Sequence, residues 1–188
     1  MTIELVIETH FHADFLSGHL ELAEATGARI VYSSVAKPEF EVISVEDGER
    51  YSLGEVQLEF RHTPGHTPES MSIVVYEKAG DTEPYGVMTG DTLFIGDVGR
   101  PDLLGSIGFT KEELADKLYD SLHTKLMTLP DTTRVYPAHG AGSACGKNLS
   151  TELWSTMGEQ RKTNYALRAS SKEKFVELVT EGQPPAPG

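Results

Sequence analysis

The chain has 188 residues, 38% of them hydrophobic, and it carries 16 Lys and Arg against 29 Asp and Glu. The net charge of −13 argues against nucleic acid as a partner, because binding phosphates requires a basic surface. The longest apolar runs are five or six residues, so we expect no membrane span, and the first residues predict no signal peptide. The length indicates one domain. A single cysteine, Cys145, cannot form an internal disulfide, so we expect a protein of the reducing cytoplasm.

The first third of the chain predicts short strands and one helix. An apolar run over residues 3–8 indicates a buried strand that leads into the polar segment 9–15. A helix is expected over 18–25, with Ser17 as its N-cap and Gly27 as its stop. Further strands are expected at 29–32, 40–44 and 56–60. An acidic turn at 46–49 lies between the last two of them.

The remainder of the chain alternates strands with helices. Strands are expected at 71–76, 85–88 and 134–136. A polar connection over 78–84 joins the first two, and a Gly-rich loop over 96–102 follows the second. A long helix is predicted over 111–126, because leucines recur every four residues and Thr110 with Glu113 suits a capping box. Two more helices are expected, over 156–167 and 171–179. Ser170 or Ser171 is the expected N-cap of the second helix.

Side chains that bind metal ions follow four of the expected strands. They are His10, His12 and Asp14 after the first strand, then His66, Asp91 and His139 on later loops. These nitrogen and oxygen donors exclude a thiolate-rich structural zinc site and suit a catalytic Zn, Fe or Mn. Two imidazoles and one carboxylate leave positions open on a single Fe(II), whereas a dinuclear hydrolytic site needs more donors.

The order of these residues resembles the metallo-β-lactamase superfamily, whose dinuclear members carry His-x-His-x-Asp-His. In this chain Phe15 stands where the final His of that motif would be, and a phenyl ring cannot bind a metal. The departure favours one metal and weighs against a thioester hydrolase of the glyoxalase II kind. The fold that the resemblance implies is α+β, an αββα sandwich.

Longer segments are similar to the persulfide dioxygenases (sulfur dioxygenases) of that superfamily, from about Val6 to Val179. They are THFHADF at 9–15, HTPGHTPE at 62–69, TGDTLFIGDVGRPD at 89–102, YPAHGAGSACGK at 136–147 and TMGEQRKTN at 156–164. The resemblance implies that a small-molecule persulfide, such as glutathione persulfide, is oxidised by O₂ to sulfite and thiol at one non-haem Fe(II) per chain, with Zn as the alternative metal. It implies His10, His66 and Asp91 as ligands, with His12, Asp14 and His139 as outer-shell groups or alternative ligands.

Three further residues are assigned through the same resemblance. Arg100 and Arg161 match arginines that face the carboxylates of a glutathione-type substrate, for which a bidentate guanidinium is suited. The alternative for each arginine is a surface ion pair. Cys145 lies just after His139 and is expected either to relay sulfur or to be a small buried residue.

Two departures from the family bear on completeness. Family members begin with further strands, whereas this chain begins nine residues before its His-x-His motif. We therefore expect residues 1–180 to form a domain that lacks its first strands, with an exposed sheet edge and low stability unless another chain supplies them. The Pro-rich tail over 181–188 resembles a linker toward a rhodanese domain. A homodimer and a rhodanese partner are thus expected partners, and a non-catalytic remnant is the alternative to an enzyme.

Overall fold

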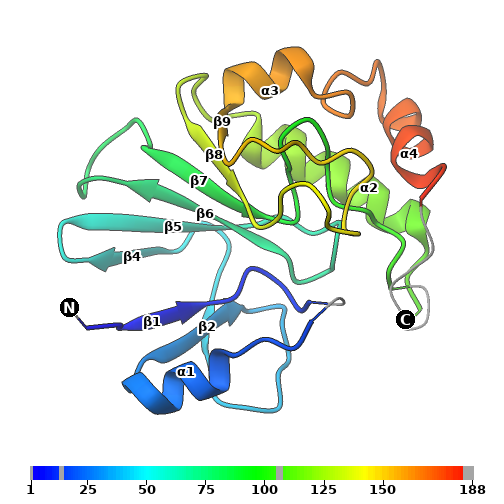
Figure 1. Ribbon diagram of the computed structural model, residues 1–188. Helices are drawn as coiled ribbons and strands as arrows, with labels where there is room; N and C mark the ends of the chain where they lie inside the picture. Colours follow the sequence, from blue (N-terminus) through cyan, green and yellow to red (C-terminus); the bar gives the residue numbers. More distant parts are fainter. Residues whose placement is uncertain (1, 13–14, 105–107, 184–188) are drawn as a thin grey trace.

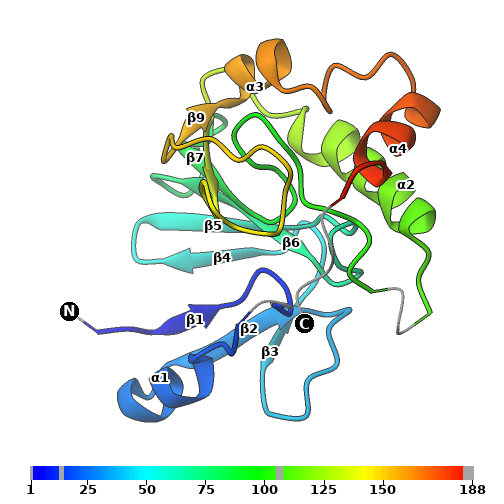
Figure 2. The ribbon, with the colours of Figure 1, turned by 45° about the vertical axis from the view of Figure 1, so that its right-hand side comes forward.

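Two β-sheets lie face to face, and helices cover the outer face of each. The computed structural model describes residues 2–12, 15–104 and 108–183. Helix α1 (His19–Thr26) covers the smaller sheet, while α2 (Lys111–Ser121) and α4 (Lys172–Thr180) cover the larger one (Figure 1 and Figure 2). This arrangement confirms the predicted α+β fold with αββα layers. Within the described residues, no helix is long and apolar enough to cross a membrane.

The strands divide into a parallel sheet and a mixed sheet. The smaller sheet has the order β1-β2-β3, with parallel pairing throughout, and consists of β1 (Leu5–Ile7), β2 (Arg29–Ser33) and β3 (Ile43–Val45). The larger sheet runs in chain order from β4 to β9 and consists of β4 (Arg50–Leu53), β5 (Val56–His62), β6 (Met71–Tyr76), β7 (Gly86–Gly90), β8 (Arg134–Pro137) and β9 (Ser155–Thr156). The sequence did not predict β4 or β9.

Two helix predictions need correction at their ends. The helix expected over 111–126 is α2 followed by a π-helical turn, η2 (Leu122–Leu126), although its predicted capping box at Thr110 is confirmed. The helix expected over 156–167 is α3 (Met157–Thr163), which ends early because Asn164 is extended and its amide donates to the Asp97 carbonyl at 2.9 Å.

The start of α1 also differs from the prediction. Gly18 occupies the N-cap position without a side-chain hydrogen bond, and the Ser17 hydroxyl donates to the Glu8 carboxylate instead. The predicted stop at Gly27 is confirmed, since this residue has a φ of 72° and its N–H closes the last turn on the Ala23 carbonyl.

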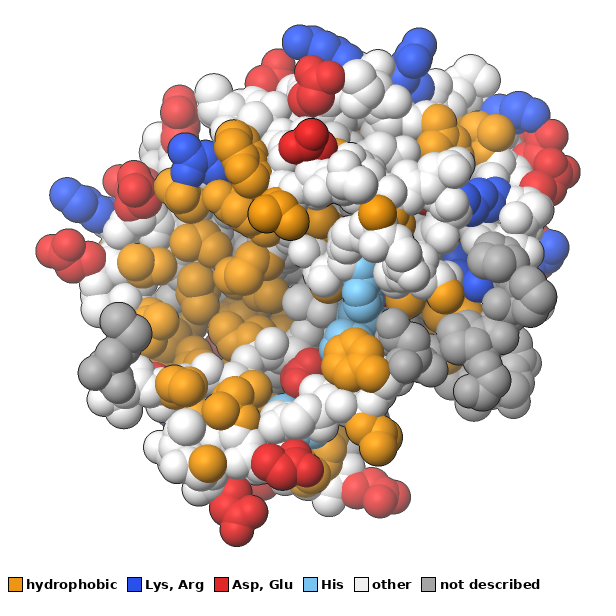
Figure 3. All heavy atoms as spheres, in the orientation of Figure 1, with side chains coloured by type: hydrophobic (Ala, Val, Ile, Leu, Met, Phe, Trp, Pro, Cys, Tyr) orange, Lys and Arg blue, Asp and Glu red, His pale blue; other side chains and the backbone are white. Residues whose placement is uncertain are grey.

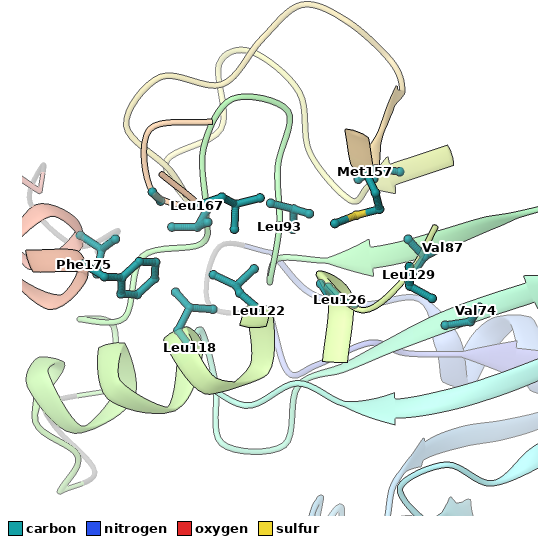
Figure 4. Close-up of a cluster of buried hydrophobic side chains, with 14 of the residues drawn as sticks. Val74, Val87, Leu93, Leu118, Leu122, Leu126, Leu129, Met157, Leu167 and Phe175 are labelled. Carbon is teal, nitrogen blue, oxygen red and sulfur yellow. The ribbon is translucent and has the colours of Figure 1, made fainter. Parts of the chain in front are cut away.

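Separate apolar clusters hold the layers together. Leu118 and Leu122 pack with Phe175 of α4 between the larger sheet and its helices, as Figure 4 shows. Phe60 and Ile73 pack against Val31 between the two sheets. Full burial of each such side chain stabilises the fold by about 1.5–3 kcal/mol, so these clusters fix the positions of the strand ends.

The facing sheets leave apolar side chains exposed on one face of the molecule. Figure 3 shows apolar side chains gathered around a hollow. The large exposed side chains of the chain include Leu53 of β4 and Met88 of β7, together with Ile3 and Trp154, which precede β1 and β9. Strand β1 pairs only with β2 in the part of the chain that the structure describes, so its other edge has no neighbouring strand there.

The topology brings four strand ends to one edge. Strands β5, β7 and β8 run in the same direction, because β6 is antiparallel to both β5 and β7, and β8 is parallel to β7. The loops that follow these three strands therefore start at the same edge of the sheet. The loop after β1 reaches this edge from the facing sheet, where the Thr9 carbonyl accepts a 2.8 Å hydrogen bond from the N–H of Met71.

Candidate metal centre

Two glycines allow the loops of this edge to approach one another closely. Gly90, which precedes Asp91, has a φ of 52°, and a Cβ there would lie 2.7 Å from the Thr9 hydroxyl oxygen. A Cβ on Gly99 would lie 1.8 Å from the Asp91 carbonyl oxygen. A larger residue at Gly90 would push apart the segments that carry His10 and Asp91, and one at Gly99 would displace the segments that carry Asp91 and His66.

Three imidazoles converge on the Asp91 carboxylate. Oδ2 of Asp91 lies 3.4 Å from Nε2 of His66, 3.4 Å from Nε2 of His139 and 3.7 Å from Nε2 of His10. His10, His66 and Asp91 are each at most 2% exposed, whereas His139 is partly exposed. One potential ligand atom from each of the three buried residues lies within 4.8 Å of the others, which is a spacing that a single metal ion can bridge.

Hydrogen bonds on the far side of the rings orient these histidines. Nδ1 of His66 donates to the carbonyl of Arg100 at 2.9 Å, so the lone pair lies on Nε2, which faces Asp91. Nδ1 of His10 lies 2.9 Å from the Thr9 hydroxyl oxygen. Such partners fix the ring orientation and the tautomer of metal-binding histidines.

The protonation of the cluster suits a cation. Burial, together with the neighbouring His66, lowers the pKa of His10 to about 3, and burial also lowers the pKa of His66, so both rings are neutral near pH 7. Burial alone would raise the pKa of Asp91, but His139, His66 and His10 hold it at about 2. Neither Asp91 oxygen has a hydrogen bond of ordinary geometry among the described residues. A buried anion of this kind, beside two neutral imidazoles, fits a bound metal ion.

A second donor group shares Asp91. Asp91, His139 and Cys145 also offer ligand atoms within 4.8 Å of one another. Contacts with Asp91 and Cys145 raise the pKa of His139 to about 10, although its burial opposes this shift. Cys145 is 2% exposed, so it is a buried residue, and it lies beside Asp91 and His139. Its expected role as a sulfur relay stays a prediction.

His12 does not belong to the group formed by His10, His66 and Asp91. Its Nε2 lies 3.3 Å from Oε2 of Glu8, and its ring packs 4.1 Å from that of Phe15 between centroids. The remaining predicted group, Asp14, lies outside the described residues.

Both predicted substrate arginines have hydrogen-bond partners within the chain. Arg100 is 1% exposed, and its Nε and Nη2 donate to the two carboxylate oxygens of Asp102 at 2.7 and 2.8 Å. Arg161 donates to the Asp131 carboxylate and to the carbonyls of Met127 and Leu129. These bonds tie α3 to the segment after η2, and the substrate role of Arg161 stays a prediction.

Two residues of the site carried no signal in the sequence. Glu8 ends an ordinary apolar run, yet its carboxylate contacts His12 and Ser17 of the following loop and His19 at the start of α1. Asp97 is fully buried and joins the loop after β7 to the loop that follows His139 through the N–H groups of Lys147 and Asn148, both at 2.7 Å. Both roles depend on loops folding back, which spacing alone does not reveal.

Comparison with known proteins places this site in a family context. The family model described as the metallo-beta-lactamase superfamily matches residues 1–139. The human mitochondrial persulfide dioxygenase ETHE1 is 31% identical over 182 residues, which are 96% of this chain and 63% of that protein. The hydroxyacylglutathione hydrolase of Prochlorococcus marinus is 27% identical over 95% of this chain and 77% of its own length. This chain therefore spans less than two thirds of the length of the persulfide dioxygenase.

Solved structures agree with this assignment. A metallo-beta-lactamase from Staphylococcus aureus superposes with a TM-score of 0.89 at 36% identity, covering 98% of this chain and 55% of that one. ETHE1 from Myxococcus xanthus superposes with a TM-score of 0.81 at 30% identity, covering 100% of this chain and 72% of that one. The chain thus belongs to the metallo-beta-lactamase superfamily, as a homologue of the persulfide dioxygenases.

Proposed function

We propose that this chain oxidises a low-molecular-weight persulfide with O₂ at a single non-haem Fe(II) held by His10, His66 and Asp91. The observation that carries the proposal is this buried three-ligand group in a homologue of the persulfide dioxygenases. The balanced reaction consumes the persulfide, O₂ and water, and it yields the thiol, sulfite and two protons. Glutathione persulfide is the substrate that we would test first.

The residues around the cluster have distinct tasks in this proposal. His10 and His66 present neutral nitrogens, and Asp91 supplies the negative charge that balances a divalent cation. An iron(II) ion bound by three protein groups would supply open positions for a sulfur anion and O₂. His139, whose Nε2 lies 3.4 Å from Asp91, holds a proton beside this carboxylate in the metal-free protein and would give it up when the metal binds.

A metal-dependent thioester hydrolase is the second candidate. The observation that favours it is that Asp91 belongs to two donor groups, which is the arrangement that a pair of metal ions requires. Similarity to a hydroxyacylglutathione hydrolase points in the same direction. Phe15 weighs against this candidate, because it provides no ligand for a second metal.

Anaerobic reconstitution with Fe(II), followed by O₂ uptake with glutathione persulfide and by counting of bound metal, separates the candidates. We expect one iron per chain and persulfide-dependent O₂ uptake, both lost in His66→Ala. The control is His123→Ala, since His123 stacks on Tyr119 of α2 and bonds to its carbonyl. Two metals with thioester cleavage would support the hydrolase, and the absence of metal and turnover would support a non-catalytic remnant. A homodimer and a rhodanese partner remain predictions.

A further inference from the structure

Cys145 places a sulfur atom beside the carboxylate of a proposed metal ligand. Its Sγ, a ring nitrogen of His139 and a carboxylate oxygen of Asp91 all lie within 4.8 Å of one another. The proposed function takes its ligands from His10, His66 and Asp91 and gives the thiol no task. A sulfur, a nitrogen and an oxygen donor therefore meet in a group whose thiol the proposed reaction leaves unused.

Hydrogen bonds fix the backbone on either side of the thiol. The N–H of Cys145 donates to the Ser143 hydroxyl oxygen at 3.1 Å, and its carbonyl accepts from the N–H of Arg100 at 2.9 Å. The carbonyl of Arg100 in turn accepts from Nδ1 of His66 at 2.9 Å. These contacts hold Cys145 against the loop that carries His66, so its position does not depend on a bound ion. A ligand that is held in place in advance loses little entropy when an ion binds.

His139 and Asp91 have the spacing of two ligands on one ion. The N–H of Ala138 donates to the carbonyl of Gly90 at 3.1 Å, which joins the two loops directly before these residues. Nε2 of His139 then lies 3.4 Å from Oδ2 of Asp91. Two ligands with bonds of about 2.0–2.1 Å to a tetrahedral ion are also separated by about 3.4 Å. The pair therefore needs little movement to bind such an ion.

Asp91 supplies an observation that is independent of the thiol. Its side chain is fully buried, and neither carboxylate oxygen has a hydrogen bond of ordinary geometry among the described residues. A buried anion of this kind requires a cation nearby, and its two oxygens can serve two ions. The side chain of His139 is 18% exposed, which gives an ion a route from solvent to the buried carboxylate.

The chemistry of the donors selects the ion. A thiolate with one imidazole and one carboxylate suits Zn(II) and the softer Cd(II), whereas Mg(II), Ca(II) and Mn(II) prefer oxygen ligands. The group formed by His10, His66 and Asp91 contains no sulfur and lacks this preference. We propose that Asp91, His139 and Cys145 form a second cation site, selective for thiophilic ions, which shares Asp91 with the first. The proposal goes beyond the proposed function, which needs neither the thiol nor a second ion.

Titration of the metal-free chain with Cd(II) tests this proposal, because a cadmium–thiolate bond has an ultraviolet absorption band of its own. We expect the wild type to develop this band with the first equivalent of Cd(II), and Cys145→Ser should abolish it. His139→Gln should weaken Cd(II) binding by more than about tenfold, since losing a ligand costs more than losing an outer-shell partner. His123→Gln is the control and should bind as the wild type does, because His123 stacks on Tyr119 and belongs to neither group.

The wild type alone can refute the proposal. A band that is absent, or that appears only after the first equivalent has bound, would show that no site selective for thiophilic ions exists, whatever the variants do. An unchanged affinity in His139→Gln would show that the thiol binds cadmium without the rest of the group. His66→Ala, once circular dichroism shows that it folds, should keep the band, and its loss would show that the ion needs the first group. Under the proposed function the same variant loses iron, so the two proposals can fail separately.

Discussion

Asp97→Asn tests whether one buried carboxylate holds together the loops that carry Asp91 and His139. Oδ1 of Asp97 accepts from the N–H of Val98 at 2.8 Å and from the Tyr165 hydroxyl at 2.9 Å. Oδ2 accepts from the N–H groups of Lys147 and Asn148, both at 2.7 Å. Burial and the neighbouring Asp97 raise the pKa of Tyr165, so the phenol remains a donor at neutral pH.

The magnitude follows from these contacts. An asparagine keeps one oxygen, which can serve both loop N–H groups, while the Tyr165 hydroxyl can rotate to accept from the new amide. The Val98 N–H then faces an amide donor and loses its partner, which costs about 1–3 kcal/mol, and the three remaining bonds lose their charge at about 1 kcal/mol each. We therefore expect Asp97→Asn to lower the free energy of unfolding by about 4–6 kcal/mol, a shift of about 8–24 °C in Tm for a chain of this length.

Urea unfolding of the metal-free protein, followed by circular dichroism, measures this effect without a contribution from bound metal. Tyr165→Phe is the matched control, because it removes one bond to the same carboxylate and should cost about 1.5–3 kcal/mol. A loss below 1 kcal/mol in Asp97→Asn, or a larger loss in Tyr165→Phe, would refute the reasoning.

Three further predictions concern close packing and pH. Gly99→Ala should prevent stable folding or metal binding, because its Cβ would lie 1.8 Å from the Asp91 carbonyl oxygen, whereas Gly140→Ala, with its nearest neighbour at 3.7 Å, should melt and bind metal as the wild type does. Burial alone would raise the pKa of Glu59, but Arg61 and Arg50 lower it, so this residue stabilises the fold above its unfolded pKa of about 4.3 and the contribution is lost as the pH falls through the lower folded pKa. The urea midpoint of Glu59→Gln should then approach that of the wild type at acid pH, while the exposed Glu55→Gln should follow the wild type at every pH. Because the pKa of His139 is raised to about 10, its contribution in the metal-free protein is complete below the unfolded pKa of about 6.5 and is lost as the pH rises toward 10. Zn(II) binding at pH 8 should release about one proton per metal, as measured with a pH indicator, and an equal release from His139→Gln would contradict this assignment.

The sequence predicted the site best where strand ends alone determine position. His66, Asp91 and His139 follow apolar runs that are indeed β5, β7 and β8, and parallel strand directions bring such loops together. The convergence of His10 with His66 and Asp91 could therefore be predicted from the positions of the strands and the order of the layers alone. Details within the loops were beyond this reasoning, because they depend on contacts between segments far apart in the chain.

The errors have the same physical origin. Ser17 has the residue type for an N-cap, but α1 begins one residue later than predicted, with Gly18 at the N-cap, and the Ser17 hydroxyl donates to the Glu8 carboxylate. Strand β4 was missed because it has only four residues, Arg50–Leu53, too few for their alternation of polar and apolar side chains to predict a strand, and its position is fixed by pairing with β5.

Charge explains why the group formed by His10, His66 and Asp91 suits a cation. Asp91 is 2% exposed and stays ionised, so a positive charge must lie nearby. His10 and His66 cannot supply that charge near pH 7, since their pKa values are lowered, which leaves the imidazolium of His139 in the metal-free protein. A divalent metal between His10, His66 and Asp91 would provide the charge at shorter range and would remove the need for that proton. Metal binding and deprotonation of His139 are therefore coupled, and proton release reports directly on occupancy of the proposed site.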